Sequence, residues 1–360
     1  MQTLSGKIIN HDNSFNGNIV FDKKIISLEK TQKETSNKII IPGFIDLHCH
    51  GGNGHDTMQG LNSIIKMSQY HLSNGTTTLM PTTITSYESE LLNSLDGFDD
   101  YLYKNKFLTN ISGIHLEGPF INSKKLGAQP SKTISPSIEF IKKIQKIAKI
   151  KIMTLAPELY GSEKVIDYLF KNKIKVQFGH SIADYACCYK HMKSRKVGFT
   201  HLFNAMSGAD SRKPGLVTAA LKHANFSEII CDLIHVDEAN IKLANKCIEN
   251  LYSISDSICA TGLDDGFYKF AGHNIEKKQG KALIDNKILA GSVINMHDSF
   301  KNLLKINFSF EEAVAMTSYN ASKYIEEKNI GKIDIGYFSN ILVLDNNLDI
   351  KEIYLYGNLV

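Results

Sequence analysis

The chain has 360 residues, of which 42% are hydrophobic and 22% are charged, a composition typical of a globular protein with a large core. The formal net charge is only +4 and no basic run alternates with aromatic residues, which argues against nucleic acid binding. No stretch has the length and apolar character of a membrane span or a signal peptide. The six cysteines form no Cys-x-x-Cys pair, so we expect a reduced, cytoplasmic protein without membrane contact.

Both ends of the chain show the pattern of short β-strands separated by polar turns. The apolar runs are residues 7–9, 18–20, 24–26 and 38–41 at the N-terminus, and 340–344 and 351–356 at the C-terminus. We expect residues 1–42 and 325–360 to combine in one small β-sandwich domain.

The middle of the chain, residues 43–324, alternates buried strands with amphipathic helices such as 137–148 and 163–171. The strand candidates are residues 44–47, 77–80, 111–116, 151–155, 174–178, 197–200, 229–234 and 252–255. This pattern predicts an α/β fold, a (β/α)₈ TIM-like barrel whose active face lies after the strands. The alternative is an open doubly wound sheet, but no Gly-x-Gly-x-x-Gly follows any strand and only a closed barrel gathers the polar residues described next.

Six residues suited to metal binding follow these strands: His48, His50, Glu117, His180, His201 and Asp256. Any one of them alone is more often a structural residue, but their repeated position after apolar runs favours one shared site. Because side chains alternate along a strand, His48 and His50 lie on one face and can reach the same cation. Imidazole and carboxylate ligands suit Zn²⁺, Fe²⁺, Mn²⁺ or Co²⁺, so the sequence predicts metal-assisted hydrolysis.

Other polar residues leave alternatives open. His115 shares a face with Glu117, and a core histidine with satisfied hydrogen bonds is slightly favoured over a supporting role. Arg212 and His235 fit an anion or sugar contact about as well as an ordinary loop. The Asp264-Asp265 pair lies between glycines and indicates a turn.

The motifs resemble those of the N-acetylglucosamine-6-phosphate deacetylases of the amidohydrolase superfamily, over nearly the full length of the chain. The matching segments are Pro-Gly-Phe-Ile-Asp-Leu-His-Cys-His-Gly-Gly (42–52), His-Leu-Glu-Gly-Pro-Phe (115–120), Gly-Ala-Gln (127–129), Leu-Ala-Pro-Glu (155–158), Gly-His-Ser (179–181), Thr-His-Leu-Phe-Asn-Ala-Met (200–206), Arg-x-Pro-Gly (212–215), His-Val-Asp (235–237), Ile-Ser-Asp-Ser (254–257) and Leu-Ala-Gly-Ser (289–292). His-Leu-Glu-Gly-Pro and Thr-His-Leu-Phe-Asn-Ala-Met distinguish this family from dihydroorotases and ureases.

The resemblance implies a metal-dependent enzyme that acts on an amino-sugar phosphate as a homodimer. Glu117, His180 and His201 would hold one divalent metal, and His48 and His50 a second one bridged by Glu117. The implied substrate contacts are Ala128, Gln129, Asn204, Ala205, Asp232, His235, Leu289, Ala290 and Gly291, with Arg212 reaching the phosphate in the neighbouring subunit's site. Gln129 stands where some members carry a histidine that polarises the acetyl carbonyl.

The expected reaction is hydrolysis of N-acetyl-D-glucosamine 6-phosphate to glucosamine 6-phosphate and acetate by a metal-bound hydroxide. Asp256 would act as general base and then as general acid, taking the proton of the water and passing it to the leaving amine. Alternatives are another amino-sugar phosphate such as the galactosamine epimer, or a cyclic amide. A non-catalytic sugar-phosphate binding protein is disfavoured, because every metal and acid–base position holds a competent residue.

Overall fold

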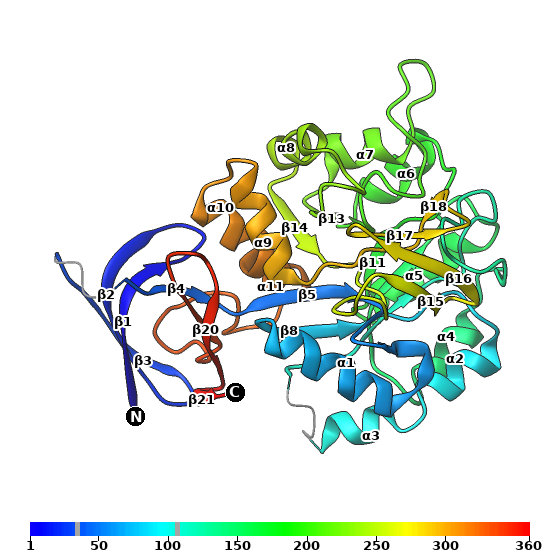
Figure 1. Ribbon diagram of the computed structural model, residues 1–360. Coiled ribbons are helices and arrows are strands. Elements are labelled where there is room, and N and C mark those ends of the chain that lie inside the picture. Colours follow the sequence, from blue (N-terminus) through cyan, green and yellow to red (C-terminus); the bar gives the residue numbers. More distant parts are fainter. Residues whose placement is uncertain (33–36, 105–108) are drawn as a thin grey trace.

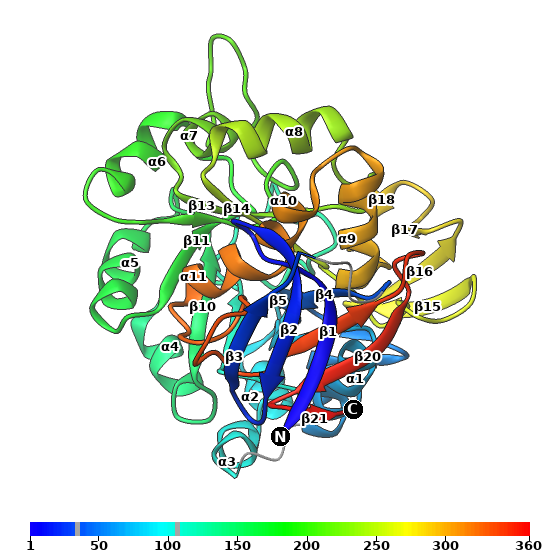
Figure 2. The ribbon, with the colours of Figure 1, turned by 90° about the vertical axis from the view of Figure 1, so that its left-hand side faces the viewer.

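The computed structural model describes residues 1–32, 37–104 and 109–360, which form an α/β body and a smaller β part beside it (Figure 1). The β part is one sheet of seven strands in the order β21-β20-β19-β4-β1-β2-β3. Its strands are β1 (Gln2–Ile9), β2 (Ser14–Phe21), β3 (Ile25–Lys30), β4 (Ile39–Pro42), β19 (Ile341–Leu344), β20 (Ile350–Leu355) and β21 (Asn358–Leu359). Figure 2 shows the strands of the two chain ends side by side.

Strand β4 is the element that joins the two chain ends. It pairs in parallel with β1 on one side and antiparallel with β19 on the other. β4 therefore joins strands of both chain ends into one continuous sheet. Phe21 of β2 and Tyr354 of β20 have three strands between them in the sheet order, yet their ring centroids are 5.1 Å apart, so the sheet curls over its apolar face. The expected β-sandwich stays a prediction. A cluster of buried apolar side chains, including Ile8, Ile40 and Val343, covers one face of this sheet.

Eight parallel strands form the centre of the body. They are β5 (Phe44–Cys49), β8 (Thr76–Pro81), β9 (Ile114–Glu117), β10 (Ile150–Leu155), β11 (Lys175–Phe178), β12 (Gly198–Phe199), β13 (Phe226–Ile230) and β14 (Asn250–Ile254). Parallel ladders join β5 to β8, β9 through β12, and β13 to β14.

Isolated bridges and hydrogen bonds connect these three groups of strands. Parallel bridges link Thr82 to His115 and Cys49 to Ser257. Between β12 and β13, the Leu202 N–H donates to the Glu228 carbonyl over 2.9 Å. Neighbours in space thus follow the order of the chain, and the last strand lies beside the first.

The seventh strand begins and ends earlier than the sequence pattern indicates. It was expected at residues 229–234, whereas β13 covers Phe226–Ile230. The apolar residues after Ile230 lie in a turn, because the Asp232 carboxylate accepts hydrogen bonds from the backbone N–H groups of Ile234 and His235 at 2.9 and 2.8 Å.

Helices lie between consecutive parallel strands, and further helices follow β14. They are α1 (Leu61–Ser73), α2 (Glu88–Ser94), α3 (Phe98–Tyr103), α4 (Ile138–Ile144), α5 (Ser162–Lys171), α6 (Tyr185–Met192), α7 (Leu216–His223), α8 (Glu238–Cys247), α9 (Met296–Lys305), α10 (Phe310–Val314) and α11 (Asn320–Ile325), with the 3₁₀ turn η1 (Thr57–Gln59) and the π-helix η2 (Ala315–Tyr319). The helix expected at 163–171 is α5, which buries Val165, Ile166 and Leu169 at the spacing of one helix face. In the described part of the chain, none of the helices has the length and apolar character needed to span a bilayer.

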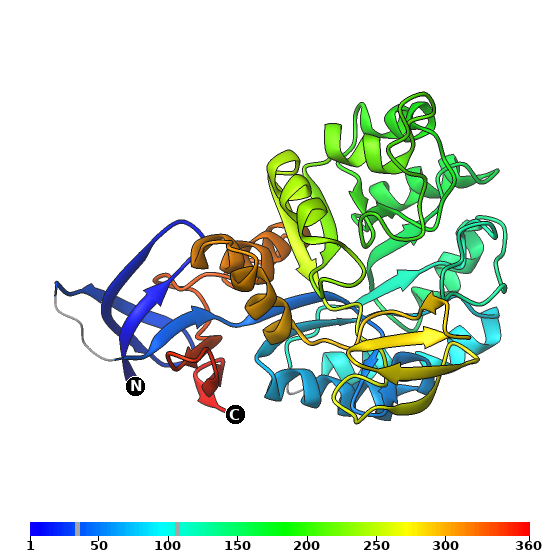
Figure 3. The same ribbon diagram turned by 45° about the horizontal axis from the view of Figure 1, so that its top comes forward.

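A four-stranded antiparallel sheet follows β14 and was not anticipated. It consists of β15 (Gly266–Phe270), β16 (His273–Lys278), β17 (Lys281–Ile284) and β18 (Ile288–Leu289), drawn in yellow in Figure 3. Its first two turns are Ala271-Gly272 and Gln279-Gly280, and all four residues have positive φ, as tight hairpin turns require. A shorter hairpin, β6 (Gly51–Gly52) and β7 (His55–Asp56), follows β5.

Candidate metal and substrate site

Four histidines converge where the parallel strands end. His48 lies at the end of β5 and His50 just after it, whereas His180 and His201 follow β11 and β12. The Nε2 atoms of His48 and His50 are 3.2 Å apart, and those of His180 and His201 are 3.0 Å apart. The structure therefore places the four rings as two pairs, each with its Nε2 atoms turned toward a common point.

Hydrogen bonds on the far side of the rings explain this orientation. A backbone carbonyl only accepts, so a ring nitrogen bonded to one carries a proton, and in the neutral form of the ring Nε2 then keeps the lone pair that can bind a metal. Nδ1 of His50 and Nδ1 of His180 each donate to a backbone carbonyl. Nδ1 of His48 donates to a carboxylate instead. The pairs are His50 Nδ1 with Thr82 O at 3.2 Å, His180 Nδ1 with Lys125 O at 2.8 Å, and His48 Nδ1 with Glu228 Oε2 at 2.9 Å.

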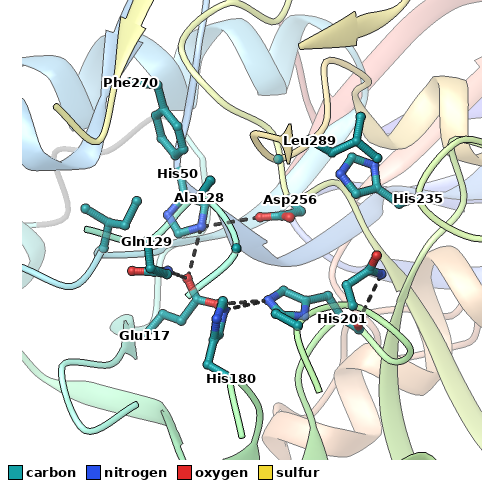
Figure 4. Close-up of a pocket in the computed structure, with 15 residues that line it drawn as sticks. His50, Glu117, Ala128, Gln129, His180, His201, His235, Asp256, Phe270 and Leu289 are labelled. Carbon is teal, nitrogen blue, oxygen red and sulfur yellow. Dashed lines mark hydrogen bonds and ion pairs between the residues drawn. The ribbon is translucent and has the colours of Figure 1, made fainter. Parts of the chain in front are cut away.

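Glu117 lies between the two histidine pairs (Figure 4). Its Oε1 is 3.1 Å from the Nε2 atoms of both His180 and His201, and its Oε2 is 3.3 Å from Nε2 of His50. Oε1 thus faces the His180–His201 pair and also lies 3.6 Å from Nε2 of His48, whereas Oε2 faces His50. Two groups of ligand atoms result, Glu117 with His180 and His201 and Glu117 with His48 and His50, each with its atoms within 4.8 Å of one another.

The charges around Glu117 fit bound cations. Burial opposes ionisation of Glu117, but the charge of His48 and the hydrogen bonds of His180 and His201 hold its pKa well below the usual range. Burial also opposes a charge on His50, yet its hydrogen bonds to Asp256 and Glu117 raise its pKa to about 9. Protons on buried imidazoles here balance buried carboxylates, and divalent cations bound to nitrogen and oxygen ligands would do the same.

Asp256 faces the His48–His50 pair from the other side. Its Oδ1 is 3.4 Å from Nε2 of His48 and 3.3 Å from Nε2 of His50, and its backbone N–H donates to the His48 carbonyl. Burial opposes ionisation, but the hydrogen bond to His50 and the charges of His48, His50 and His201 lower the pKa of Asp256 to about 2. Asp256 is therefore a carboxylate at neutral pH and can accept a proton.

Backbone strain is concentrated at the same residues. His180, His201 and Asp256 have φ values of +48°, +30° and +48°, a region that costs non-glycine residues energy. The surrounding hydrogen bonds hold the three side chains in place in spite of this cost.

An open pocket lies above these side chains, and it is lined by most of the expected substrate contacts. The lining residues are His50, Ile84, Glu117, Gly127, Ala128, Gln129, His180, His201, Asn204, Ala205, His235, Asp256, Phe270, Leu289 and Gly291. Figure 4 shows His235 and Leu289 on one side of Asp256, and Phe270 with Gln129 on the other.

Several expected residues lie elsewhere. Asp232 and Ala290 do not line the pocket, and Ala290 is fully buried. Asp232 instead lies behind His235, whose Nδ1 it holds at 2.6 Å. Arg212 belongs to the exposed loop 208–213, which projects at the top of Figure 1, away from the pocket of its own chain.

Both polar atoms of the Gln129 side-chain amide form hydrogen bonds. Its Nε2 donates to Glu117 Oε2, and its Oε1 accepts the Thr85 backbone N–H at 2.7 Å. This residue thus orients the carboxylate between the histidine pairs, while its side chain also forms part of the pocket wall.

Glu228 is the supporting residue that the sequence analysis did not find. It is fully buried, and its carboxylate accepts from His48, from Gln177 Nε2 at 2.9 Å and from the His201 backbone N–H at 3.3 Å. Burial raises its pKa, but the charge and hydrogen bond of His48 outweigh this effect and lower it. The sequence signal for Glu228 is the alternation of side chains along β13, which places Glu228 on the same face of the strand as Ile230.

His115 is a core residue under the histidine pairs. Both ring nitrogens have protein partners, Nδ1 with the Leu47 carbonyl at 3.1 Å and Nε2 with Thr154 Oγ1 at 2.7 Å. Burial and the charge of His48 lower its pKa to about 4, so this ring is neutral. The geometry agrees with the slightly favoured interpretation from the sequence.

Comparison with known proteins places the chain in a family. The amidohydrolase family model matches residues 39–360. The N-acetylglucosamine-6-phosphate deacetylase of Bacillus subtilis is 34% identical over 90% of this chain and 85% of its own length, and the N-acetylgalactosamine-6-phosphate deacetylase of Escherichia coli O157:H7 is 27% identical over 91% and 89%. A crystal structure of N-acetylglucosamine-6-phosphate deacetylase from Thermotoga maritima superimposes with a TM-score of 0.92, at 29% identity and 99% coverage of both chains. The chain therefore belongs to the amidohydrolase family and, within it, to the group of N-acetylglucosamine-6-phosphate deacetylases.

Proposed function

We propose that this protein hydrolyses N-acetyl-D-glucosamine 6-phosphate to glucosamine 6-phosphate and acetate. The observation that carries the proposal is Asp256 beside two histidine pairs that share Glu117, under a pocket open to a substrate. Relatives named for this activity support the choice of substrate.

The chain's own residues supply the acid–base chemistry and the positioning. A divalent cation held by Glu117, His180 and His201, with a second at His48 and His50, would polarise the acyl carbonyl and lower the pKa of water. Asp256 takes the proton of the attacking water and passes it to the amine as the C–N bond breaks. We infer that Asp256 also contacts the second cation, because its Oδ1 lies beside both histidines of that pair.

The sugar phosphate is expected to occupy the side of the pocket that holds Asn204 and His235. Burial opposes a charge on His235, but the hydrogen bond and charge of Asp232 raise its pKa, which favours a cation there. Arg212 lies outside its own pocket, so we propose a homodimer in which Arg212 contacts the phosphate in the partner's site.

We also propose the following organisation of the chain. Residues 43–324 would form a (β/α)₈ TIM-like barrel, and residues 1–42 with 325–360 the small β domain. The order of the parallel strands and the bridge between Cys49 and Ser257 support closure of the barrel. A cytoplasmic location agrees with six free cysteines.

The test is acetate release from N-acetylglucosamine 6-phosphate and from its galactosamine epimer, by metal-loaded protein and by Asp256→Asn. We expect the glucosamine substrate to be preferred and the variant to be nearly inactive. Preference for the epimer would indicate that the substrate is N-acetylgalactosamine 6-phosphate, the compound for which the Escherichia coli relative is named. No acetate from either compound would refute the proposed function.

A further inference from the structure

A second cavity lies directly beside the reaction pocket. The space within it, open mouth included, is about 1070 Å³, compared with about 590 Å³ for the reaction pocket measured in the same way. Its lining includes the apolar residues Met58, Pro130 and Ala271. The charged residues of the lining are Asp56, Glu90, Lys132 and Lys269. The mechanism described above makes no use of this cavity.

Ile84 and Phe270 separate the two cavities, since both residues line both of them. They are 5% and 4% exposed and belong to one buried apolar cluster. Phe270 also packs edge-on against His50, with ring centroids 5.7 Å apart. The wall therefore stands immediately next to a residue of the metal site.

The placement of the polar groups determines which part of a substrate meets this wall. The acyl carbon must lie near Asp256 and Glu117, where water attacks it. Figure 4 shows His235 on one side of Asp256 and Phe270 on the other, above His50. A sugar that contacts His235 thus leaves the methyl group of its acyl chain directed toward Ile84 and Phe270.

We propose that Ile84 and Phe270 are the specificity-determining wall for the acyl group, and that the cavity behind them is a latent subsite for acyl chains longer than acetyl. This inference rests on the proposed amide hydrolysis. The reaction is unchanged: water adds to the acyl carbon, the C–N bond breaks, and a carboxylate and the free amine form. The apolar residues of the cavity lining, with Ile84 and Phe270 at the boundary, fit methylene groups.

The experiment compares N-acetyl, N-propanoyl and N-butanoyl glucosamine 6-phosphates, with release of the common product glucosamine 6-phosphate as the measurement. One methylene that a hydrophobic site cannot accommodate changes kcat/KM by about 10- to 200-fold. For wild type we expect kcat/KM to fall at least about tenfold with each added methylene. Ile84→Ala should raise the butanoyl-to-acetyl ratio by about tenfold or more, and Ile84→Val by less.

Ile275→Ala is the matched control. Ile275 is buried in the same apolar cluster but lines neither cavity, so its truncation should leave the ratio unchanged. Three results would each contradict the proposed role of Ile84 and Phe270. They are an unchanged ratio in Ile84→Ala, an equal rise in Ile275→Ala, and a wild type that hydrolyses the butanoyl substrate as well as the acetyl one. If Ile84→Ala does not fold, Ile84→Val decides by the same ratio. A wild type inactive on the acetyl substrate refutes the proposed function instead.

Discussion

Glu228→Gln tests whether a buried carboxylate without contact to the pocket controls metal binding. Glu228 is fully buried and holds Nδ1 of His48 at 2.9 Å, so that Nε2 of the ring faces His50. Glutamine keeps the size of the side chain and removes its charge. The charge-assisted hydrogen bond becomes at best a neutral one, which makes the ring a weaker ligand.

The expected loss is confined to one of the two metal positions. Changing such a supporting partner typically lowers metal affinity about 10- to 100-fold, equal to roughly 1.4–2.7 kcal/mol. Among the described ligands, only the His48 ring donates a hydrogen bond to Glu228, so the loss should fall on the His48–His50 position, and the His180–His201 position should change little. The His201 backbone N–H, 3.3 Å from Glu228, allows a minor effect there.

The assay is calorimetric titration of metal-free protein with Zn²⁺ or Mn²⁺, for wild type, Glu228→Gln and Asp232→Asn. Asp232 is a buried carboxylate that orients His235 instead of a metal ligand, so its variant should bind metal as wild type does. Equal weakening of both positions in Glu228→Gln, or no weakening at all, would contradict the reasoning.

Three further results are expected. Asp256→Asn should fold and retain metal at the His180–His201 position while kcat falls about 10²- to 10⁴-fold, and substantial turnover would rule out its acid–base role. His50→Ala should lower the metal content of the purified protein by one equivalent per chain, and an unchanged content would place the second metal elsewhere. The pKa of His235 is raised above 6.5, so its positive charge persists beyond that pH and is lost as the pH rises through the raised pKa. KM for the phosphorylated substrate should increase over that range, and Asp232→Asn should shift the increase to lower pH; a pH-independent KM would exclude a charged His235.

The pattern of strand ends predicted that the candidate ligands lie close together. Polar residues that follow parallel strands meet at one end of the fold, so His48, His180 and His201 could be brought together before any coordinates. The structure places His180 and His201 with Glu117 and Asp256 around one pocket, and His48 lies next to them in a group of ligand atoms with His50 and Glu117. The chemistry of each side chain was visible in the sequence, because ligand type does not depend on packing.

Features that depend on exact strand boundaries could not be predicted from the sequence. The apolar run 229–234 suggested a strand there, but Asp232 turns the chain after Ile230, and the strand begins at Phe226 instead. That shift left Glu228 outside the predicted strand, so its inward direction could not be inferred.

The antiparallel sheet of β15 to β18 was overlooked for a different reason. Its turns, Ala271-Gly272 and Gln279-Gly280, have no Asn-Gly or Asp-Gly signature, although their glycines follow the hairpin rule. Phe270 and Leu289 reach the pocket from this sheet. The wall that we propose for the acyl group could therefore not have been found from the sequence.

The most direct test of the account is the divalent metal content per chain of a preparation that releases acetate from N-acetylglucosamine 6-phosphate. The account predicts acetate release with about two equivalents of metal, because two histidine pairs share Glu117. Full activity with about one equivalent would show that His48 and His50 hold no second metal. Bound metal without acetate release would contradict the proposed substrate.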